Sequence, residues 1–494
     1  MIEKTPHWLD KQATLTPNEI AIESPLIAPV TFSILRDRAQ KFAKKLRFLG
    51  VQEGEHVAIH SKNSLEMIIA IHGLSYLGAV IVLLNTRLSK SELAFQLDDA
   101  NARYLITTTE DQPYLEGLVN SDIVKVFSFL TVEKQPEMAS DLKKELNLDD
   151  IFTIIYTSGT TGKPKGVVHT YGNHWSSAIA SALNLGIDKQ DKWLATLPLF
   201  HVGGFSLLMK SVIYGMPIYL LEKFEVEDIH QAIMAKGVTI VSVVSVMLDR
   251  LMEKLATKSY PEEFRCMLLG GGPASAYLLE KARKKHIPVF QTYGMTETSS
   301  QVVTLSPNEA LRKIGSAGKA LFTAQMKVMN DKQEANPLEI GEIFVKGPMV
   351  TKGYYQNESA NQTVLRQGWL ATGDLGYLDE EGFLYVVDRR KDLIISGGEN
   401  VYPAEIENVL GSIDGIKEAG VVGQKDPKWG KVPVAFIIVE DKLNLDLVKQ
   451  QCRELLAKYK VPKAFYIVES LPRNASNKLL RHQLVKQLDR YIKE

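Results

Sequence analysis

The chain has few cysteines and no excess of charge of either sign. Its 494 residues include only two cysteines, Cys266 and Cys452, and its 58 basic side chains balance its 58 acidic ones. Two cysteines that lie far apart in the sequence cannot build a disulfide framework or a cysteine-rich zinc site, which favours a reducing compartment. A net charge of zero provides no global positive field, so we do not expect a nucleic-acid partner.

The sequence also lacks the hydrophobic segments that direct a chain into or across a membrane. Its first twelve residues, MIEKTPHWLDKQ, contain no apolar core of the kind found in a signal peptide. The most apolar stretch, residues 67–85, is interrupted by His72, Ser75 and two glycines, which predicts a buried helix followed by a strand. We therefore expect a soluble protein of the cytoplasm, without membrane insertion.

The length and the order of the sequence patterns predict an α/β protein with more than one domain. A chain of 494 residues exceeds the size at which a single core stops growing. Helical and strand patterns alternate over most of the chain, which is typical of helices layered on parallel sheets. The helical patterns include residues 91–100, 226–237 and 276–287, and strand patterns follow them at residues 102–108, 238–246 and 288–294.

The pattern changes toward the end of the chain. Residues 341–388 hold short strand patterns separated by glycine-rich turns, which predicts a smaller β-rich subdomain. The remaining residues combine two helical patterns with three strands, which is typical of a compact α+β unit. We therefore predict a large N-terminal domain over residues 1–390, made of layered α/β subdomains plus the β-rich one, and a small α+β C-terminal domain over residues 391–494.

Residues 156–166, YTSGTTGKPKG, form a segment of glycine, serine and threonine with two lysines. Glycine lets the backbone approach an anion, and hydroxyls, main-chain N–H groups and lysine supply donors and charge, so the composition predicts phosphate binding. The segment is not a Walker A loop, because Gly159 and Gly162 are too close in sequence and Pro164 follows Lys163. We expect residues 164–166 to form a turn before an extended segment. The alternative is a flexible surface hairpin, since the same residue types are common in turns.

This segment is followed by further motifs in a fixed order, and together they resemble the signature of the adenylate-forming superfamily. That superfamily includes acyl-CoA synthetases, carrier-protein-loading adenylation domains and luciferases. The motifs are PLFH (198–201), LLGGGPA (268–274), YGMTE (293–297), GSAGKA (315–320), TGDLG (372–376), DRRKDLIISGGENVYP (388–403) and LPRNASNK (471–478). The resemblance covers most of the chain, and it implies that a carboxylate attacks the α-phosphorus of ATP before a thiol displaces AMP.

The resemblance implies a role for each matching residue. Magnesium would meet Glu297, the α-phosphate would meet Thr296, and both ribose hydroxyls would meet Asp374, a bidentate contact suited to a carboxylate. Tyr293 would stack on adenine. The other residues implied to bind ATP are Thr157, Ser158, Gly159, Thr160, Thr161 and Lys163 at the β- and γ-phosphates, Gly270, Gly271, Gly272 and Pro273 at adenine, and Gly294 and Arg389.

Other implied roles concern the attack on ATP and the change to the second half-reaction. Lys478 would neutralise charge between the α-phosphate and the attacking carboxylate, although Asn477 stands before it where the family has glycine. Lys391 would be the hinge on which a mobile C-terminal domain pivots, because Lys478 must leave before a thiol enters. Gly397 and Gly398 would line the tunnel for CoA. His201 would separate the carboxylate route from the thiol route.

The acid pocket is predicted from a helix over residues 202–210, a strand over residues 241–248 and the segment after YGMTE. The lining mixes apolar and polar groups, which suits an aromatic acid with a second polar substituent better than a fatty acid, because unpaired buried polar groups cost about 1–3 kcal/mol each. The residues expected there are His201, Phe205, Ser245, Val246, Gly270, Ser299, Ser300 and Gln301.

Taken whole, the motifs resemble most closely those of the o-succinylbenzoate–CoA ligases of menaquinone biosynthesis. This implies ATP, Mg²⁺ and CoA as partners of the reaction, and o-succinylbenzoate as the acid, with Ser299, Ser300, Gln301 or an ordered water at its second carboxylate.

The alternatives are another aryl- or acyl-CoA ligase, a carrier-protein-loading enzyme, a nucleotide-binding protein without chemistry and a luciferase-like oxygenase. The sequence leaves open whether the chain forms a homo-oligomer. Taken singly, Tyr293 and His201 could instead be core residues, and Glu297 and Lys478 could be solvated.

Overall fold

The computed structural model describes residues 3–119, 123–158, 164–271, 276–310, 312–330, 333–388, 392–440, 443–472, 479 and 481–491. The chain divides into two compact units. The larger unit holds residues 1–86, 97–155 and 166–387, and the smaller unit holds residues 87–96, 156–165 and 388–494. Two short segments from the first half of the sequence thus belong to the smaller unit.

One sheet is mostly parallel and, within the described residues, has seven strands in the order β21-β10-β9-β5-β4-β6-β7. All five residues of β5 are buried, as expected for a strand covered on both faces. The strands are β4 (His56–His60), β5 (Val80–Leu84), β6 (Tyr104–Thr107), β7 (Lys125–Ser128), β9 (Ile151–Ser158), β10 (Pro164–Thr170) and β21 (Gly353–Tyr354).

The predicted turn at residues 164–166 is wrong, because these residues begin strand β10. Proline is tolerated as the first residue of a strand, where its missing N–H is not needed. The carbonyl oxygen of Gly166 accepts a hydrogen bond from the N–H of Tyr355 at 2.8 Å, so this end of the strand is paired.

A second sheet has nine strands among the described residues, in the order β17-β16-β15-β14-β13-β11-β12-β2-β3. Its middle strands are parallel and its edges are antiparallel. The strands are β2 (Ile20–Ser24), β3 (Ile27–Thr31), β11 (Trp193–Ala195), β12 (Ile218–Leu220), β13 (Ile240–Val243), β14 (Cys266–Leu269), β15 (Val289–Met295), β16 (Ser300–Leu305) and β17 (Lys319–Ala320).

The strand patterns predicted over residues 238–246 and 241–248 both extend too far along the chain. β13 ends at Val243, and helix α10 (Ser245–Leu255) begins two residues later. The buried residues of α10 are Met247, Leu248, Leu251, Met252 and Leu255. Their spacing follows one face of a helix, and this longer pattern outweighs the β-branched residues at the start of the segment.

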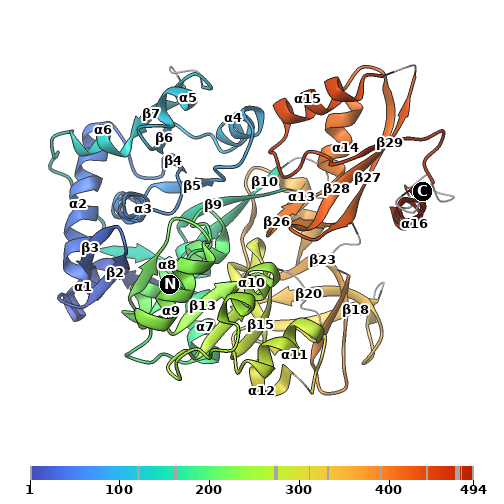
Figure 1. Ribbon diagram of the computed structural model, residues 1–494. Helices are drawn as coiled ribbons and strands as arrows, with labels where there is room; N and C mark the ends of the chain where they lie inside the picture. The colour runs from blue at the N-terminus through green and yellow to red at the C-terminus, as the bar shows by residue number, and fades with distance from the viewer. Residues whose placement is uncertain are drawn as a thin grey trace. The chain divides into compact units, whose positions relative to one another are not determined.

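Helices cover these sheets, as Figure 1 shows. Helix α3 is buried on nearly every side, which confirms the buried helix predicted from the apolar stretch. None of the helices in the described ranges is long and apolar enough to cross a membrane. Besides α10, the helices of this part of the chain are α1 (Trp8–Leu15), α2 (Phe32–Phe48), α3 (Leu65–Leu77), α4 (Lys90–Asp99), α5 (Gln112–Glu116), α6 (Phe129–Glu133), α7 (Tyr171–Leu185), α8 (Val202–Tyr214), α9 (Val226–Ala235), α11 (Ala276–Lys284), α12 (Pro307–Ala310) and α13 (Glu358–Val364).

The predicted β-rich subdomain is present in the larger unit as an antiparallel sheet with the order β19-β18-β20-β23-β22, and β24 pairs with β23. Val328, Ile343 and Val345 from this sheet share a core with Tyr293 and Val303 of the neighbouring sheet. The strands are β18 (Gln325–Asn330), β19 (Gln333–Glu334), β20 (Gly341–Lys346), β22 (Leu365–Arg366), β23 (Trp369–Leu378) and β24 (Leu384–Asp388). A separate two-stranded sheet joins β1 (Lys4–Pro6) to β8 (Glu145–Asn147).

The smaller unit is built on a sheet with the order β26-β25-β28-β27, with β29 beside β28. Two separate apolar clusters lie in it, one containing Ile406 and Cys452 and the other Phe436 and Leu484. Its elements are β25 (Ile394–Ser396), β26 (Glu399–Val401), α14 (Pro403–Gly411), β27 (Ile416–Asp426), β28 (Gly430–Val439), α15 (Leu445–Leu455), β29 (Phe465–Ile467) and α16 (Arg481–Tyr491).

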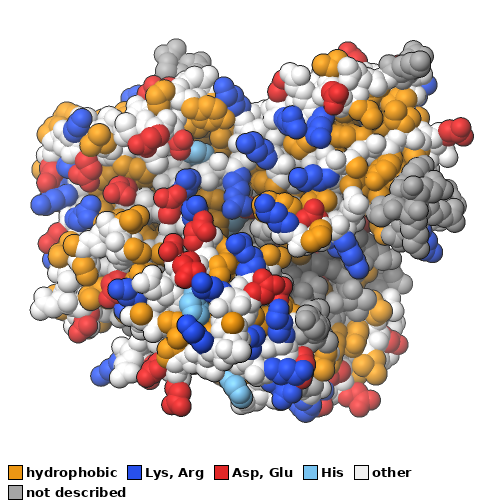
Figure 2. All heavy atoms as spheres, viewed as in Figure 1, with side chains coloured by type: hydrophobic (Ala, Val, Ile, Leu, Met, Phe, Trp, Pro, Cys, Tyr) orange, Lys and Arg blue, Asp and Glu red, His pale blue; other side chains and the backbone are white. Residues whose placement is uncertain are grey.

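Each unit contains one of the two cysteines, and both are free and buried. Burial raises the pKa of the Cys266 thiol to about 12 and that of the Cys452 thiol to about 11. Charged side chains of both signs are scattered over the face seen in Figure 2, in keeping with the net charge of zero.

Candidate active site

The turn between β15 and β16 brings together the predicted magnesium and α-phosphate residues. Thr296 and Glu297 lie in a single 3₁₀ turn, Thr296–Thr298. The two residues after it have unusual backbones: φ is 55° at Ser299 and 136° at Ser300. Non-glycine residues in such conformations cost about 1–3 kcal/mol each, and they persist only where the surroundings hold them.

Side chains from neighbouring elements hold this turn. His169 on β10 lies with its Nε2 2.6 Å from the carbonyl oxygen of Thr296. Ser177 on α7 donates its hydroxyl to the carbonyl oxygen of Ser299 at 3.0 Å. Ser299 in turn donates its own hydroxyl to the carbonyl oxygen of Met349 at 2.8 Å. The turn is therefore fixed at several points by the protein itself.

The carboxylate of Glu297 is also oriented. Its Oε1 accepts a hydrogen bond from the hydroxyl of Tyr354 at 2.8 Å, and its backbone carbonyl accepts the N–H of Thr351 at 2.8 Å. The described residues contain no group of three or more His, Cys, Asp or Glu side chains that could hold a metal ion. A single oriented carboxylate fits Mg²⁺ that is held mainly by phosphate oxygens and water.

Asp374, the predicted ribose contact, lies on β23 and is almost fully buried. Its Oδ2 accepts a hydrogen bond from the hydroxyl of Tyr293 at 2.7 Å, and its backbone N–H donates to the hydroxyl of Thr372 at 3.1 Å. Tyr293 lies on β15, and its ring belongs to the core shared by the two sheets. The predicted stacking of Tyr293 on adenine stays a prediction, whereas its hydroxyl orients the carboxylate.

The glycines of the site differ in their surroundings. Gly270 and Gly271 follow the end of β14, where adenine is predicted to lie. Gly294 is required by packing, because a β-carbon there would lie 2.1 Å from the carbonyl oxygen of Ser300 across the hairpin. Gly294 is thus explained by the approach of two strands, independently of its predicted part in ATP binding.

The first half of helix α8 and its N-cap carry two of the residues predicted for the acid pocket, Phe205 and His201. His201 is the N-cap residue of α8. Phe205 is fully buried and packs against Phe152 and His174, with ring centroids 5.6 Å and 4.9 Å away. Ser206 donates its hydroxyl to Ser300 at 3.2 Å, so α8 contacts the strained turn.

The other predicted pocket residues are spread over three elements. Ser245 begins helix α10, together with Val246, and does not lie on a strand as predicted. Gln301 on β16 is buried and donates its amide to the hydroxyl of Ser181 at 3.1 Å. Its carbonyl oxygen, Oε1, has no hydrogen-bond partner among the described residues. Gln301 therefore keeps an acceptor free, which does not attract a carboxylate.

Lys210 on α8 is a buried cation that the sequence analysis did not single out. Only 2% of its surface is exposed, and its ammonium lies 5.2 Å from the ring centroid of Trp193. No hydrogen bond or ion pair of this ammonium is recorded within the described part of the chain, and burial lowers its pKa to about 8. The signal in the sequence was a single charged residue in a mostly apolar helix, FSLLMKSVIY.

Lys210 shares one face of α8 with Ser206, whose hydroxyl reaches the strained turn. Gly203, Ser206 and Lys210 are spaced by three and four residues, which places them on the same side of the helix. Seven residues separate Gly203 from Lys210, which is about 10 Å along the axis. The stripe therefore leads from the end of α8 near His201 to a buried positive charge.

In the smaller unit, the predicted CoA-tunnel residues Gly397 and Gly398 form the two-residue turn between β25 and β26. Their φ values are 58° and 87°, and two consecutive residues with positive φ are what a tight hairpin turn needs. A β-carbon at Gly397 would lie 2.6 Å from the ring of Trp429. The hairpin explains both glycines, and their part in a tunnel stays a prediction.

Several predicted residues lie outside the described part of the chain. Two of the predicted phosphate-binding residues, Thr157 and Ser158, are described and are the last residues of strand β9. The predicted residues that lie outside the described part are Gly159, Thr160, Thr161, Lys163, Gly272, Pro273, Arg389, Lys391 and Lys478.

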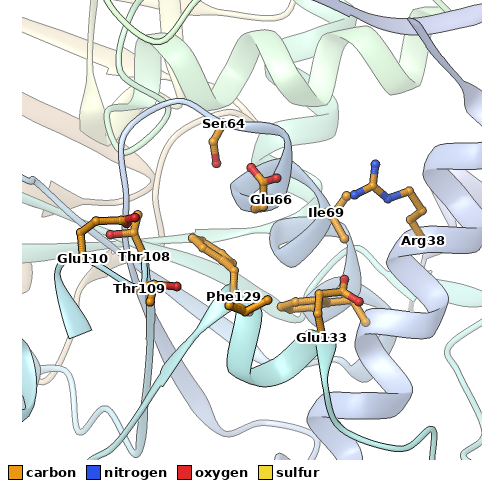
Figure 3. A pocket seen from close by; sticks show the side chains of 11 residues that line it. Arg38, Ser64, Glu66, Ile69, Thr108, Thr109, Glu110, Phe129 and Glu133 are labelled. Atoms are coloured by element: carbon orange, nitrogen blue, oxygen red, sulfur yellow. The ribbon is translucent and has the colours of Figure 1, made fainter. Parts of the chain in front are cut away.

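One pocket of the larger unit, of about 360 Å³, contains none of the predicted site residues. Figure 3 shows Glu66 and Ile69 entering it from α3, Ser64 from the N-cap of that helix, and Phe129 and Glu133 from α6. Its remaining lining residues are Arg38, Phe42, Thr108, Thr109, Glu110 and Leu130.

Comparison with protein families gives two matches that together span most of the chain. The model of AMP-binding enzymes matches residues 9–355, and the model of their C-terminal domain matches residues 405–478. The first match includes the strained turn with Thr296 and Glu297.

Individual proteins agree over the full length. A 2-succinylbenzoate–CoA ligase of Oceanobacillus iheyensis is 56% identical over 489 residues, covering 98% of this chain and 100% of the relative. A double mutant of the o-succinylbenzoate CoA synthetase of Bacillus subtilis, solved with the product analogue OSB-NCoA, is 48% identical with a TM-score of 0.94, and 98% of each chain is covered. The Bacillus subtilis protein solved with the acyl-adenylate OSB-AMP is 49% identical with a TM-score of 0.77, again over 98% of each chain.

Proposed function

Because the chain belongs to the family of AMP-binding enzymes, we propose that it is an ATP-dependent acid–thiol ligase that joins o-succinylbenzoate to CoA. The observation that carries this proposal is the full-length match, at 56% identity, to a relative named for that reaction. The products are o-succinylbenzoyl-CoA, AMP and pyrophosphate. This reaction serves menaquinone (vitamin K2) biosynthesis, and the reducing cytoplasm suits a chain with two free, buried cysteines.

The first half-reaction uses the residues of the larger unit. A carboxylate of the acid attacks the α-phosphorus of ATP, and pyrophosphate leaves. Thr296 donates to the α-phosphate, Glu297 meets Mg²⁺ and Asp374 accepts from the ribose hydroxyls. The fixed turn and the Tyr293–Asp374 hydrogen bond support these roles, because positioning and electrostatic stabilisation supply most of the rate of phosphoryl-type transfers. The Bacillus subtilis protein has been solved in complex with ATP and a magnesium ion, at 48% identity and a TM-score of 0.77 over 98% of this chain.

The second half-reaction transfers the acyl group to the thiol of CoA and releases AMP. Lys478 acts in the first step only, and a pivot at Lys391 removes it so that CoA can enter past Gly397 and Gly398. His201, at the start of α8, separates the acid route from the thiol route.

Lys210 receives the carboxylate of o-succinylbenzoate that is not activated. The acid has two carboxylates, and the second must be buried with a partner, since an unpaired buried charge is costly. Lys210 is a buried cation without an anion among the described residues, on the face of α8 that also carries Ser206. Ser299, proposed for this role from sequence alone, uses its hydroxyl for the carbonyl of Met349.

The experiment that tests the function measures pyrophosphate release from ATP and Mg²⁺ with a panel of acids, followed by CoA addition and mass analysis. Release with o-succinylbenzoate and formation of its CoA thioester support the proposal. Release with a different acid preserves the two-step mechanism and refutes the substrate. An adenylate that is formed but not transferred to CoA points to a carrier-protein-loading enzyme.

A further inference from the structure

His169 links a buried strand to the turn that carries Thr296 and Glu297. It lies on β10 and is fully buried, and its Nε2 is 2.6 Å from the carbonyl oxygen of Thr296. A carbonyl oxygen can only accept, so the Nε2 of His169 carries the proton and donates it. The same carbonyl accepts the N–H of Ser299, which closes the 3₁₀ turn. His169 therefore braces this turn from outside.

The other ring nitrogen of His169 is fixed by two further buried side chains. Its Nδ1 is 3.3 Å from the hydroxyl oxygen of Thr153, and this oxygen is 3.0 Å from Nε2 of His174. With Nε2 protonated, the neutral ring has a lone pair on Nδ1, so Thr153 donates to His169 and accepts from His174. The hydrogen bonds then run in a single direction, from His174 through Thr153 and His169 to the turn.

All donors of these three side chains are used. The atom left without a partner among the described residues is an acceptor, Nδ1 of His174. Burial lowers the pKa of His169 to about 4 and that of His174 well below its ordinary value, so both rings are neutral at physiological pH. A second proton on His169 would turn Nδ1 into a donor facing the hydroxyl that donates to it.

We propose that His169 is a positioning residue for the adenylation step, because it holds the carbonyl of Thr296 and thereby the geometry in which Thr296 and Glu297 meet the α-phosphate and magnesium. The inference rests on the roles proposed above for this turn. The turn is followed by Ser299 and Ser300, whose backbones are strained, so it relaxes when a brace is removed. A small displacement of positioned groups lowers the rate of the step that depends on them.

The test uses two nearly isosteric variants. His169→Gln keeps an N–H donor at the position of Nε2, and His169→Met removes it. The rate of pyrophosphate release reports the first half-reaction, and transfer of a chemically prepared acyl-adenylate to CoA reports the second. We expect His169→Met to slow the first half-reaction at least about tenfold and to leave the second within about twofold. His169→Gln should recover most of the loss.

Two further variants separate positioning from folding. His72→Met removes another buried histidine, which lies on α3 outside the chain of hydrogen bonds that leads to the turn. Whatever it does to the Tm, it should not separate the two half-reactions. Thr153→Val removes the donor that fixes the ring of His169, and it should slow the first half-reaction by about threefold. This variant provides the test if His169→Met does not fold.

Equal losses in both half-reactions, or a His169→Gln variant as slow as His169→Met, would overturn the inference. Thr296→Ala and Glu297→Gln separate its failure from that of the proposed site. If both of these retain pyrophosphate release, the roles of the turn are wrong and the inference falls with them. If they lose it while His169→Met retains it, only the role of His169 is wrong.

Discussion

Two lysines of this protein are equally buried, yet they have opposite surroundings. Lys210 in the larger unit and Lys460 in the smaller unit each have 2% of their surface exposed. The ammonium of Lys460 lies 2.5 Å from Glu92 and 2.7 Å from Glu405. Burial lowers its pKa, but the neighbouring Tyr459 and these two carboxylates outweigh burial, so the pKa is raised. The ammonium of Lys210 faces the ring of Trp193, and burial lowers its pKa to about 8.

This difference in surroundings distinguishes Lys460, a charge that stabilises the fold, from Lys210, a charge for which we propose a ligand carboxylate as partner. A buried charge with well-placed partners belongs to the fold, since removing one partner leaves the other uncompensated. A buried charge without an anion costs stability, and such costs are found where function requires them. The segment that contains Glu92, residues 87–96, belongs to the same unit as Lys460, so the ion triad helps to fix this segment there.

The largest effect is expected for Lys460→Met. It leaves Glu92 and Glu405 buried against each other, so the free energy of unfolding should fall by about 3–5 kcal/mol. Urea unfolding followed by circular dichroism measures this loss. The triple variant Lys460→Met, Glu92→Gln, Glu405→Gln removes all three charges and should recover part of it. If the single variant is as stable as the wild type, the triad does not hold this region.

The next effect concerns the pH dependence of stability and distinguishes the two lysines directly. The folded-state pKa of Lys210 is about 8, below its ordinary value of 10.5. Between these values the unfolded chain binds more protons, so the stability of the wild type should rise with pH relative to Lys210→Met, by about 3 kcal/mol in total. Below about pH 8 the cost of the buried charge is fully present, and Lys210→Met should be the more stable protein. If the free energies of unfolding of the wild type and Lys210→Met change with pH in parallel, Lys210 is not buried as a cation.

A somewhat smaller effect is expected on substrate choice. Lys210→Met should raise the KM for o-succinylbenzoate about 100-fold, because the second carboxylate loses its buried partner. We expect the carboxylate on the succinyl chain to be the activated one and the carboxylate on the ring to meet Lys210. An analogue that lacks the ring carboxylate, 4-oxo-4-phenylbutanoate, should therefore show little change in KM with the same variant. Lys210→Arg serves as the control that keeps the charge. An equal rise in KM for both acids would place Lys210 outside the carboxylate site.

The smallest effect belongs to a lysine at the surface. Lys62 pairs with Glu222 at 3.0 Å, but their side chains are 68% and 46% exposed. Water and salt screen such a pair, so Lys62→Met should change the free energy of unfolding by less than about 1 kcal/mol. A larger loss in the same urea assay would mean that the assay does not separate buried charges from exposed ones.

Much of the fold could be predicted from the sequence, because periodic patterns are local. The helical pattern at residues 226–237 corresponds to α9, and the strand pattern at residues 102–108 contains β6. The prediction was wrong after Val243, where β-branched residues favoured a strand and the apolar spacing of α10 decided the outcome. The assignment of residues 87–96 to the smaller unit depends on contacts between distant segments, which no local pattern contains.

The site was predictable in part, for a related reason. The family prediction is confirmed. It could be made from the sequence because several motifs that occur in a fixed order are specific to one family. His169 and Lys210 were missed because they lie outside those motifs, and each matters through contacts made by the folded chain. The φ values of Ser299 and Ser300 were equally hidden, since serine seldom adopts such a backbone and nothing in the sequence indicated it.

The two cysteines, one in each unit, make the protein its own reporter of local opening. A thiol reagent attacks the thiolate, and both thiols are buried with raised pKa values, so neither reacts while its unit stays closed. The labelling rate of Cys266 therefore follows the opening of the nine-stranded sheet, and that of Cys452 follows the opening of the helical face of the smaller unit. Mass spectrometry of peptides labelled over time would measure both labelling rates in a single sample of the wild-type protein.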